Sequence, residues 1–222
     1  MREPGLPVHY AVPLAVVLLM SVASVWLSLW SPRTSADRGA WSWRFFFYGA
    51  GFMLLETKSI VQFALLWGST WTSASLAIAS VLAMALASTI VAARVDIRRQ
   101  GPIAAALFAL LAVNYFVPVG RVAFGSRAAE SIFYGALVFS PVFFAGLLFS
   151  ASFRQSQSPS ADFGANLLGA MVGGLLEYAA ILVGYRSLLV LTAGLYAAAF
   201  ACNRFVVRGR PVRSLGMVED SP

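Results

Sequence analysis

Residues 45–67 read FFFYGAGFMLLETKSIVQFALLW, a run long and apolar enough to cross a bilayer, yet Glu56, Lys58 and Gln62 lie near its middle. A charged side chain at the centre of a membrane helix costs roughly 3 kcal/mol on insertion scales. Glu56 and Lys58 are two residues apart and point to nearly opposite sides of a helix, whereas Lys58 and Gln62 share a face. Polar groups on both sides predict that this helix lies inside a bundle, with partners all round it.

The composition of the whole chain is that of a membrane protein. Of its 222 residues, 59% are hydrophobic and 11% are charged. Soluble domains contain about 25% charged residues, more than twice this fraction. The apolar residues form long runs, which predict helices rather than alternating strands. We therefore expect an all-α, multi-pass protein with one helical membrane domain over residues 1–203.

Seven apolar runs are the expected membrane spans. They cover residues 10–30, 45–67, 71–93, 103–119, 131–153, 163–185 and 187–203. The basic tail, residues 204–222, is expected to be mobile. The loops and tail on one side of these spans hold eleven arginines, and those on the other side hold four. The positive-inside rule then predicts an outside N-terminus and a cytoplasmic C-terminus.

The charged residues and the rare residue types exclude several classes of protein. The net charge of +7 comes from fifteen arginines and one lysine. In a membrane protein the arginines mark cytoplasmic loops, so no nucleic-acid partner is expected. Cys202 and His9 are the single cysteine and histidine, which argues against a disulfide, a metal site, a cofactor or a histidine triad. The preference for arginine over lysine suggests a bacterial cytoplasmic (inner) membrane.

Small residues predict where helices approach closely. In the run 163–185, Ala165, Gly169 and Gly173 recur every four residues. Gly49, Gly51 and Gly174 are further expected positions of close helix packing. Asn166 and Glu177 are eleven residues apart and fall at almost the same angle on this helix. The run 71–93 carries a second stripe of small side chains and one methionine: Ser73, Ala77, Ser80, Met84 and Ala87.

The buried charges raise the question of their partners. The runs 45–67 and 163–185 are expected to cross in the same direction, which places Glu56 and Glu177 at similar depth. We therefore expect Lys58 to pair with a glutamate, with Glu177 as the favoured partner. The other carboxyl group would be protonated, bind a cation or reach water. Gln62 and Asn166 are the other expected members of this buried polar cluster. The cluster could be a structural ion pair that sets helix register, or a polar pocket for a cationic solute or a proton relay.

Three stretches resemble a known family. GAGFMLLETKSIVQ (residues 49–62), WGSTW (67–71) and FGANLLGAMVGGLLEY (163–178) are similar to the membrane region of spermidine synthase-like multi-pass proteins. In that family a polyamine aminopropyltransferase-like domain is joined to membrane helices. The resemblance covers about residues 45–200. It implies a shared membrane core made of Gly49, Gly51, Glu56, Lys58, Gln62, Asn166, Gly169, Gly173, Gly174 and Glu177. No stretch here is long enough for the synthase domain, so polyamine synthesis does not carry over.

Three functions are compatible with these observations. The first is a non-catalytic membrane module, with a separately encoded soluble aminopropyltransferase-like protein as a candidate partner. The second is a transporter that moves a small cationic, polyamine-like solute or protons past Glu56, Lys58 and Glu177. The third is an intramembrane enzyme with the two glutamates as acid and base, which is disfavoured because no nucleophile or metal ligand accompanies them. Beyond the lipid bilayer and that candidate partner, the sequence leaves a homo-oligomer open.

Overall fold

The computed structural model describes residues 16, 19, 20, 23, 42–97, 99–117, 125–178 and 184–208. Within these ranges the regular structure is entirely helical and contains no strand, as the composition predicts. The helices are α2 (Trp43–Trp67), α3 (Trp71–Arg94), α4 (Gly101–Phe116), α5 (Arg127–Phe153), α6 (Pro159–Leu176) and α8 (Tyr185–Arg208). The predicted span over residues 10–30 falls almost wholly outside the described ranges.

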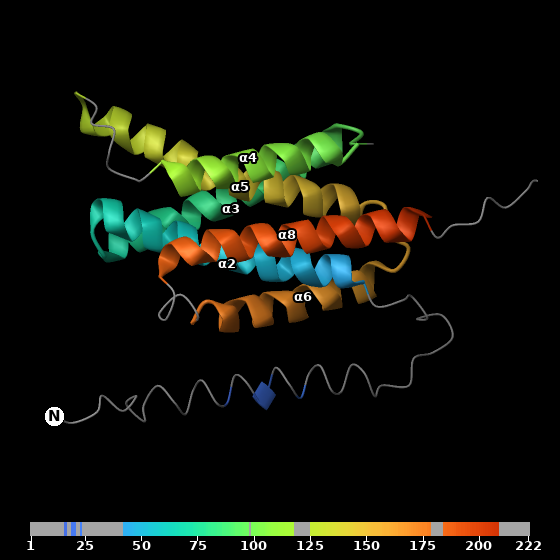
Figure 1. Ribbon diagram of the computed structural model, residues 1–222. Helices are drawn as coiled ribbons and strands as arrows, with labels where there is room; N and C mark the ends of the chain where they lie inside the picture. Colours follow the sequence, from blue (N-terminus) through green and yellow to red (C-terminus); the bar gives the residue numbers. More distant parts are fainter. Residues whose placement is uncertain are drawn as a thin grey trace, which may run out of the picture.

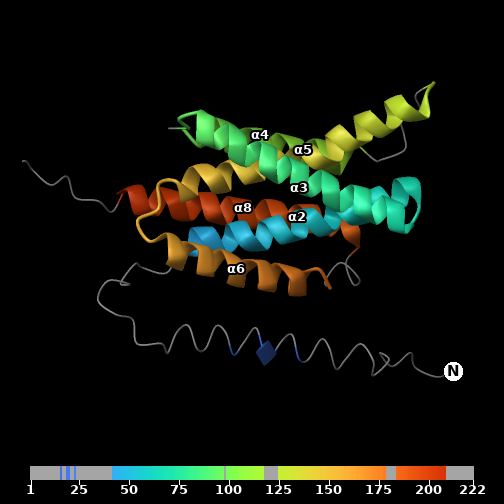
Figure 2. The same cartoon turned by 180° about the vertical axis from the view of Figure 1, so that it is seen from behind.

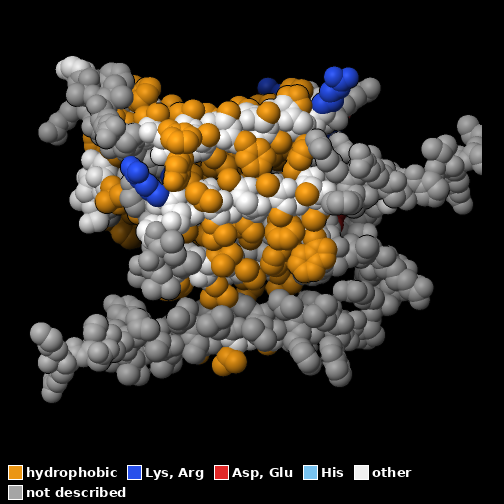
Figure 3. All heavy atoms as spheres, viewed as in Figure 1, with side chains coloured by type: hydrophobic (Ala, Val, Ile, Leu, Met, Phe, Trp, Pro, Cys, Tyr) orange, Lys and Arg blue, Asp and Glu red, His pale blue; other side chains and the backbone are white. Residues whose placement is uncertain are grey.

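Three of the described helices are long and apolar enough to cross a membrane. They are α2, α3 and the Ile132–Phe153 part of α5, and shorter apolar stretches occur in α4 and α8. Large apolar side chains also cover the outside of the bundle, among them Trp71, Phe116 and Leu65. In Figure 3 they form a broad band, and the Lys and Arg side chains seen most clearly lie toward the ends of the helices. An apolar surface of this extent is unusual for a protein that is monomeric in water.

The helix α2 lies at the centre of the bundle. It packs against α6, α8, α5 and α3, which approach it from different sides. Figures 1 and 2 show α6 on one side of α2 and α4 on the opposite side of the bundle. The prediction of partners all round this helix is confirmed in part: four helices pack against it, but Leu65 lies on the outside of the bundle and Glu56 is only half-buried.

Aromatic side chains and a tight turn hold α2 against its neighbours. The ring of Phe45 meets the rings of Phe149 and Phe153 of α5 edge to face, with centroids 5.8 and 6.0 Å apart. At its other end α2 turns into α3 through Gly68, whose φ of 85° favours glycine. Thr70 then caps α3 by accepting a hydrogen bond from the backbone N–H of Ser73 (3.2 Å).

The packed stripe of α3 differs in part from the predicted one. Ser73 and Ala77 are buried as expected, but the stripe continues through Val81, Ser88 and Ala92. The predicted positions recur every 3.5 residues, whereas a straight helix turns every 3.6 residues, so the two patterns separate along the helix. Beside this stripe Gly146 of α5 allows Ser88 to come close.

The boundaries of the last two helices also differ from the predicted spans. The run 163–185 was expected to be one helix, but α6 ends at Leu176 and Glu177 is its C-cap. The helix α8 starts two residues before the predicted span and continues to Arg208, beyond the predicted end at residue 203. Hydropathy locates the apolar part of a helix, while arginine, a good helix former, extends the helix itself. Residues 209–222 of the predicted tail lie outside the described ranges.

Candidate functional site: polar side chains around α2

Lys58 is enclosed in the bundle and bonded to a neutral partner. Its side chain is 1% exposed, and its Nζ donates a 2.8 Å hydrogen bond to Oδ1 of Asn114 in α4. No carboxylate of the described residues pairs with it. A buried amine is thus held by an amide rather than by an opposite charge.

Pro141 explains why Asn114 is available in this orientation. Proline has no N–H, so the carbonyl of Leu137, four residues earlier in α5, loses its helical donor. Nδ2 of Asn114 donates to that carbonyl at 2.8 Å and to the carbonyl of Leu110 at 3.0 Å. The hydroxyl of Ser140 donates to the carbonyl of Leu137 as well (3.2 Å). With both amide hydrogens directed at carbonyls, Oδ1 of Asn114 is left to accept from Lys58.

Glu177 lies on a different side of α2 from Lys58. Its Oε2 accepts a hydrogen bond from the hydroxyl of Thr57 at 3.0 Å. Thr57 and Lys58 are consecutive and therefore point about 100° apart on the helix. Thr57 faces α6, while Lys58 reaches α4 on the other side of the bundle (Figure 1). The predicted ion pair between Lys58 and Glu177 is wrong for this reason.

Glu56 and Gln62 occupy two further environments. The side chain of Glu56 is half-buried, and no described residue forms a hydrogen bond or ion pair with it. Its enclosure by the bundle is therefore only partial. Gln62 is 3% exposed and lies one turn beyond Lys58, and its Oε1 has no hydrogen-bond partner within the described part of the chain. The predicted cluster of Glu56, Lys58 and Glu177 is thus divided among separate sites around α2.

The predicted glycine contacts join α2 to α6. A Cβ atom on Gly49 would overlap the backbone oxygen of Asn166, and one on Gly169 would overlap that of Phe46. A Cβ on Gly173 would lie 2.6 Å from the oxygen of Ala50. The buried side chain of Ala165 continues this close face. These contacts pair the two helices in parallel, in the predicted direction.

The two remaining glycines of the predicted set differ from each other. A Cβ on Gly51 would lie 2.9 Å from the ring of Tyr196, so this glycine makes room for an aromatic side chain of α8. A Cβ on Gly174 would meet no atom within 4 Å. Gly174 therefore has no part in close helix packing in this structure.

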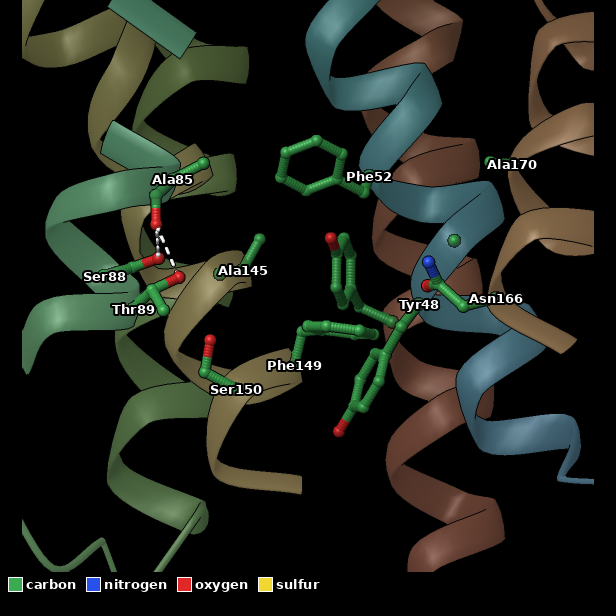
Figure 4. Close-up of a pocket in the computed structure, with 13 residues that line it drawn as sticks. Tyr48, Phe52, Ala85, Ser88, Thr89, Ala145, Phe149, Ser150, Asn166 and Ala170 are labelled. Carbon is green, nitrogen blue, oxygen red and sulfur yellow. Dashed lines mark hydrogen bonds between the residues drawn. The ribbon is translucent and has the colours of Figure 1, made fainter. Parts of the chain in front are cut away.

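A cavity of about 260 Å³ lies between the α3–α5 pair and α2, α6 and α8. Its lining residues are Tyr48, Gly49, Phe52, Ala85, Ser88, Thr89, Ala145, Gly146, Phe149, Ser150, Asn166, Ala170 and Tyr196. Figure 4 shows Phe52 and Phe149 pointing from α2 and α5 into the space between these helices. None of the lining residues is charged, and four of them are aromatic.

Two of the hydroxyl groups in this wall act as acceptors. Ser88 Oγ and Thr89 Oγ1 both donate their hydrogen to the carbonyl of Ala85, at 2.7 and 2.9 Å (Figure 4). Each hydroxyl oxygen then offers only lone pairs to anything else. Glu56 follows Phe52 by four residues on the same face of α2, about 6 Å further along the helix axis. The cavity therefore presents aromatic faces and acceptor oxygens, with a carboxyl group one turn away.

Several residues of these sites were not predicted from the sequence. Asn114, Thr57, Tyr48 and Tyr196 are not among the residues that the sequence analysis singles out. The available signal for Asn114 was an amide in one apolar run together with a mid-span proline, Pro141, in the next one. A proline at that position leaves a buried carbonyl, and a buried carbonyl requires a donor.

The described residues contain no group of three or more His, Cys, Asp and Glu side chains that could hold a metal ion. The chain matches no protein-family profile, no curated protein and no solved structure.

Proposed function

We propose that this chain is a multi-pass integral membrane protein that binds a small organic cation in the cavity between α2, α3 and α5 and carries it across the bilayer. A polyamine-like or other alkylammonium compound is the proposed class of solute. The observation that carries the proposal is the chemistry of the cavity wall, which combines aromatic rings, acceptor oxygens and no positive charge.

The aromatic lining favours a cation over a neutral solute. Tyr48, Phe52, Phe149 and Tyr196 come from α2, α5 and α8 and line one cavity. Ring faces attract ammonium groups by about 0.5–2 kcal/mol, most strongly where water is excluded. The acceptor oxygens of Ser88 and Thr89 suit the N–H groups of such a cation. Glu56 supplies the counter-charge one turn along α2.

The membrane location is supported by the three long apolar helices and by the charges at the helix ends. Arg44 is the second residue of α2, Arg94 is the last residue of α3, and Arg154 is the C-cap of α5. The guanidinium of Arg154 donates to the backbone oxygens of Ala92 and Val95, so the ends of α3 and α5 lie together. We propose seven spans with this arginine-rich end and the C-terminus in the cytoplasm, the N-terminus outside, and a bacterial cytoplasmic membrane as the location.

A non-catalytic module is the second candidate. The two longest stretches that resemble spermidine synthase-like proteins, residues 49–62 and 163–178, are packed against each other. Gly49 and Gly173 allow the contact of their backbones, and Thr57 is bonded to Glu177. This pairing favours one shared structural core for both stretches. A gene for a soluble aminopropyltransferase-like protein next to the gene for this chain would favour the module.

Binding of choline tests the proposed solute class. The full-length protein in lipid nanodiscs would be titrated with choline and, separately, with its neutral isostere 3,3-dimethyl-1-butanol. We expect saturable heat with choline and none with the alcohol. Equal binding of the two compounds, or binding of neither choline nor spermidine, would refute a cation site.

Glu56 provides the matched variant for transport. We expect Glu56→Gln to lose uptake of choline into proteoliposomes while its melting curve stays unchanged. Asp162→Asn is the control, because Asp162 lies in the first turn of α6 and does not line the cavity. A loss of uptake of the same size in both variants would show that Glu56 has no specific part in transport.

A further inference from the structure

The proline of α5 lies between a hydrogen-bond network and the wall of the cavity. Before the proline, the carbonyl of Leu137 is held by Asn114 and Ser140. After it, Ala145, Gly146, Phe149 and Ser150 line the cavity. A helix with an internal proline bends most easily at that point, because one backbone hydrogen bond is missing there.

We propose that Lys58, Asn114 and the carbonyl of Leu137 form a latch that sets the bend of α5 at Pro141 and thereby the position of the cavity wall. Each link of the latch is a short hydrogen bond, 2.8 Å from Lys58 to Asn114 and 2.8 Å from Asn114 to Leu137. The latch joins α2, α4 and α5. Its action on a bound solute rests on the proposed function, whereas its mechanical role does not.

Lys58 controls the latch through the orientation of the Asn114 amide. Nδ2 of Asn114 uses its two hydrogens for the carbonyls of Leu110 and Leu137. Oδ1 accepts only from Lys58 among the described residues. If the amine withdraws, this oxygen is left buried without a donor, and the amide gains by turning away from α5 toward another donor. The carbonyl of Leu137 then accepts a hydrogen bond from Ser140 alone, and α5 is free to change its bend at Pro141.

A second polar side chain of α2 reaches α5 at this point. Ser59 of α2 donates to the carbonyls of Leu55 (2.7 Å) and Val138 (3.5 Å), and so touches the same turn of α5. Ser59 is neutral, so Lys58 is the only charged residue among the side chains that form hydrogen bonds at the latch in the described ranges.

Hydrogen exchange of the full-length protein in nanodiscs tests the latch without any solute. In Lys58→Met and in Asn114→Leu we expect the backbone amides of residues 142–150 to exchange roughly tenfold faster, the effect of losing one or two hydrogen bonds. The amides of residues 73–92 in α3 should keep their wild-type rates. Equal acceleration in both segments, or none in residues 142–150, would overturn the proposal.

Pro141→Ala supplies the second, independent variant. This substitution restores a backbone N–H that can donate to the carbonyl of Leu137. It removes no member of the latch, so we expect the variant to fold. We expect residues 142–150 to exchange more slowly than in the wild type, and the effect of Lys58→Met to shrink at least about threefold in this background. An unchanged effect of Lys58→Met would overturn the latch. Absence of choline binding in the wild type would instead overturn only the proposed solute.

Discussion

Lys58 of α2 and Asn114 of α4 share a 2.8 Å hydrogen bond inside the bundle, although their helices are not otherwise packed closely together. The long side chain of Lys58 bridges this gap. Its partner is itself held by carbonyls of α4 and α5. One polar link between two helices therefore depends on a proline in a third helix.

This link predicts a coupling in stability between the two residues. Lys58→Met leaves Oδ1 of Asn114 buried without a donor, and Asn114→Leu leaves the amine without its acceptor. Each substitution is expected to cost about 1–3 kcal/mol of unfolding free energy. The double variant is expected to cost less than the sum, with a coupling of about 0.5–3 kcal/mol. Reversible unfolding in mixed detergent micelles measures all three values, and strict additivity would refute the bond.

The close contact of α2 and α6 predicts opposite outcomes for two consecutive glycines. Gly173→Ala places a methyl group 2.6 Å from the backbone oxygen of Ala50, and we expect a loss of about 1–3 kcal/mol of unfolding free energy. Gly174→Ala meets no atom within 4 Å and should be neutral or stabilising, because alanine is the better helix former. Thermal melting of both variants in the same detergent checks the difference. Equal melting temperatures would contradict this helix pairing.

The bond between Thr57 and Glu177 predicts a cost for removing the hydroxyl. In Thr57→Val the carboxyl group of Glu177 loses its donor, and we expect a loss of about 1–2 kcal/mol of unfolding free energy. Thr89→Val is the control, since the hydroxyl of Thr89 is exposed and bonds only within its own helix. Chemical unfolding of both variants would give the comparison. A larger loss in Thr89→Val would argue against the contact between α2 and α6 at Glu177.

The aromatic wall predicts the effect of removing one ring. Phe149→Ala removes a ring that points into the cavity, and choline should bind roughly 3-fold to 30-fold more weakly. The same substitution also removes packing against Phe45, so melting curves must show that the protein remains folded at the titration temperature. Phe116→Ala, an exposed position outside the cavity, is the control. Unchanged affinity in Phe149→Ala would place the solute elsewhere.

The proposed orientation predicts which turns face the cytoplasm. In a Cys202→Ser background, Ser69→Cys lies in the turn between α2 and α3, and Arg99→Cys lies before α4. In intact cells we expect a membrane-impermeant maleimide to label Ser69→Cys only, and both variants after the membrane is opened. Labelling of Arg99→Cys alone in intact cells would reverse the orientation.

The class of the fold and the central helix could be predicted, because both follow from where charge and apolar residues lie in the sequence. Glu56 and Lys58 on opposite sides of one helix required neighbours for α2. The small residues Gly169 and Gly173 indicated that some helix approaches α6 closely, but they did not indicate which one. The end of α6 at Leu176 could not be predicted, because the apolar run continues beyond it.

The partner of Lys58 could not be predicted, because opposite charge alone favoured a glutamate. The partner of Lys58 depends on the spatial order of the helices, which places α6 and α4 on different sides of α2. An amide became the partner only because Pro141 positions it, a relation between runs that are far apart in sequence. The cavity is likewise built from five helices, so no single stretch of sequence indicated it.

An electron cryomicroscopy map of the full-length protein in lipid nanodiscs, at a resolution that defines side chains, tests the central position of α2 most directly. We expect density for Nζ of Lys58 to join that of Asn114, with α6, α8, α5 and α3 packed against α2. A map that places α2 at the edge of the bundle, with Lys58 directed at acyl chains, would contradict the central position of α2.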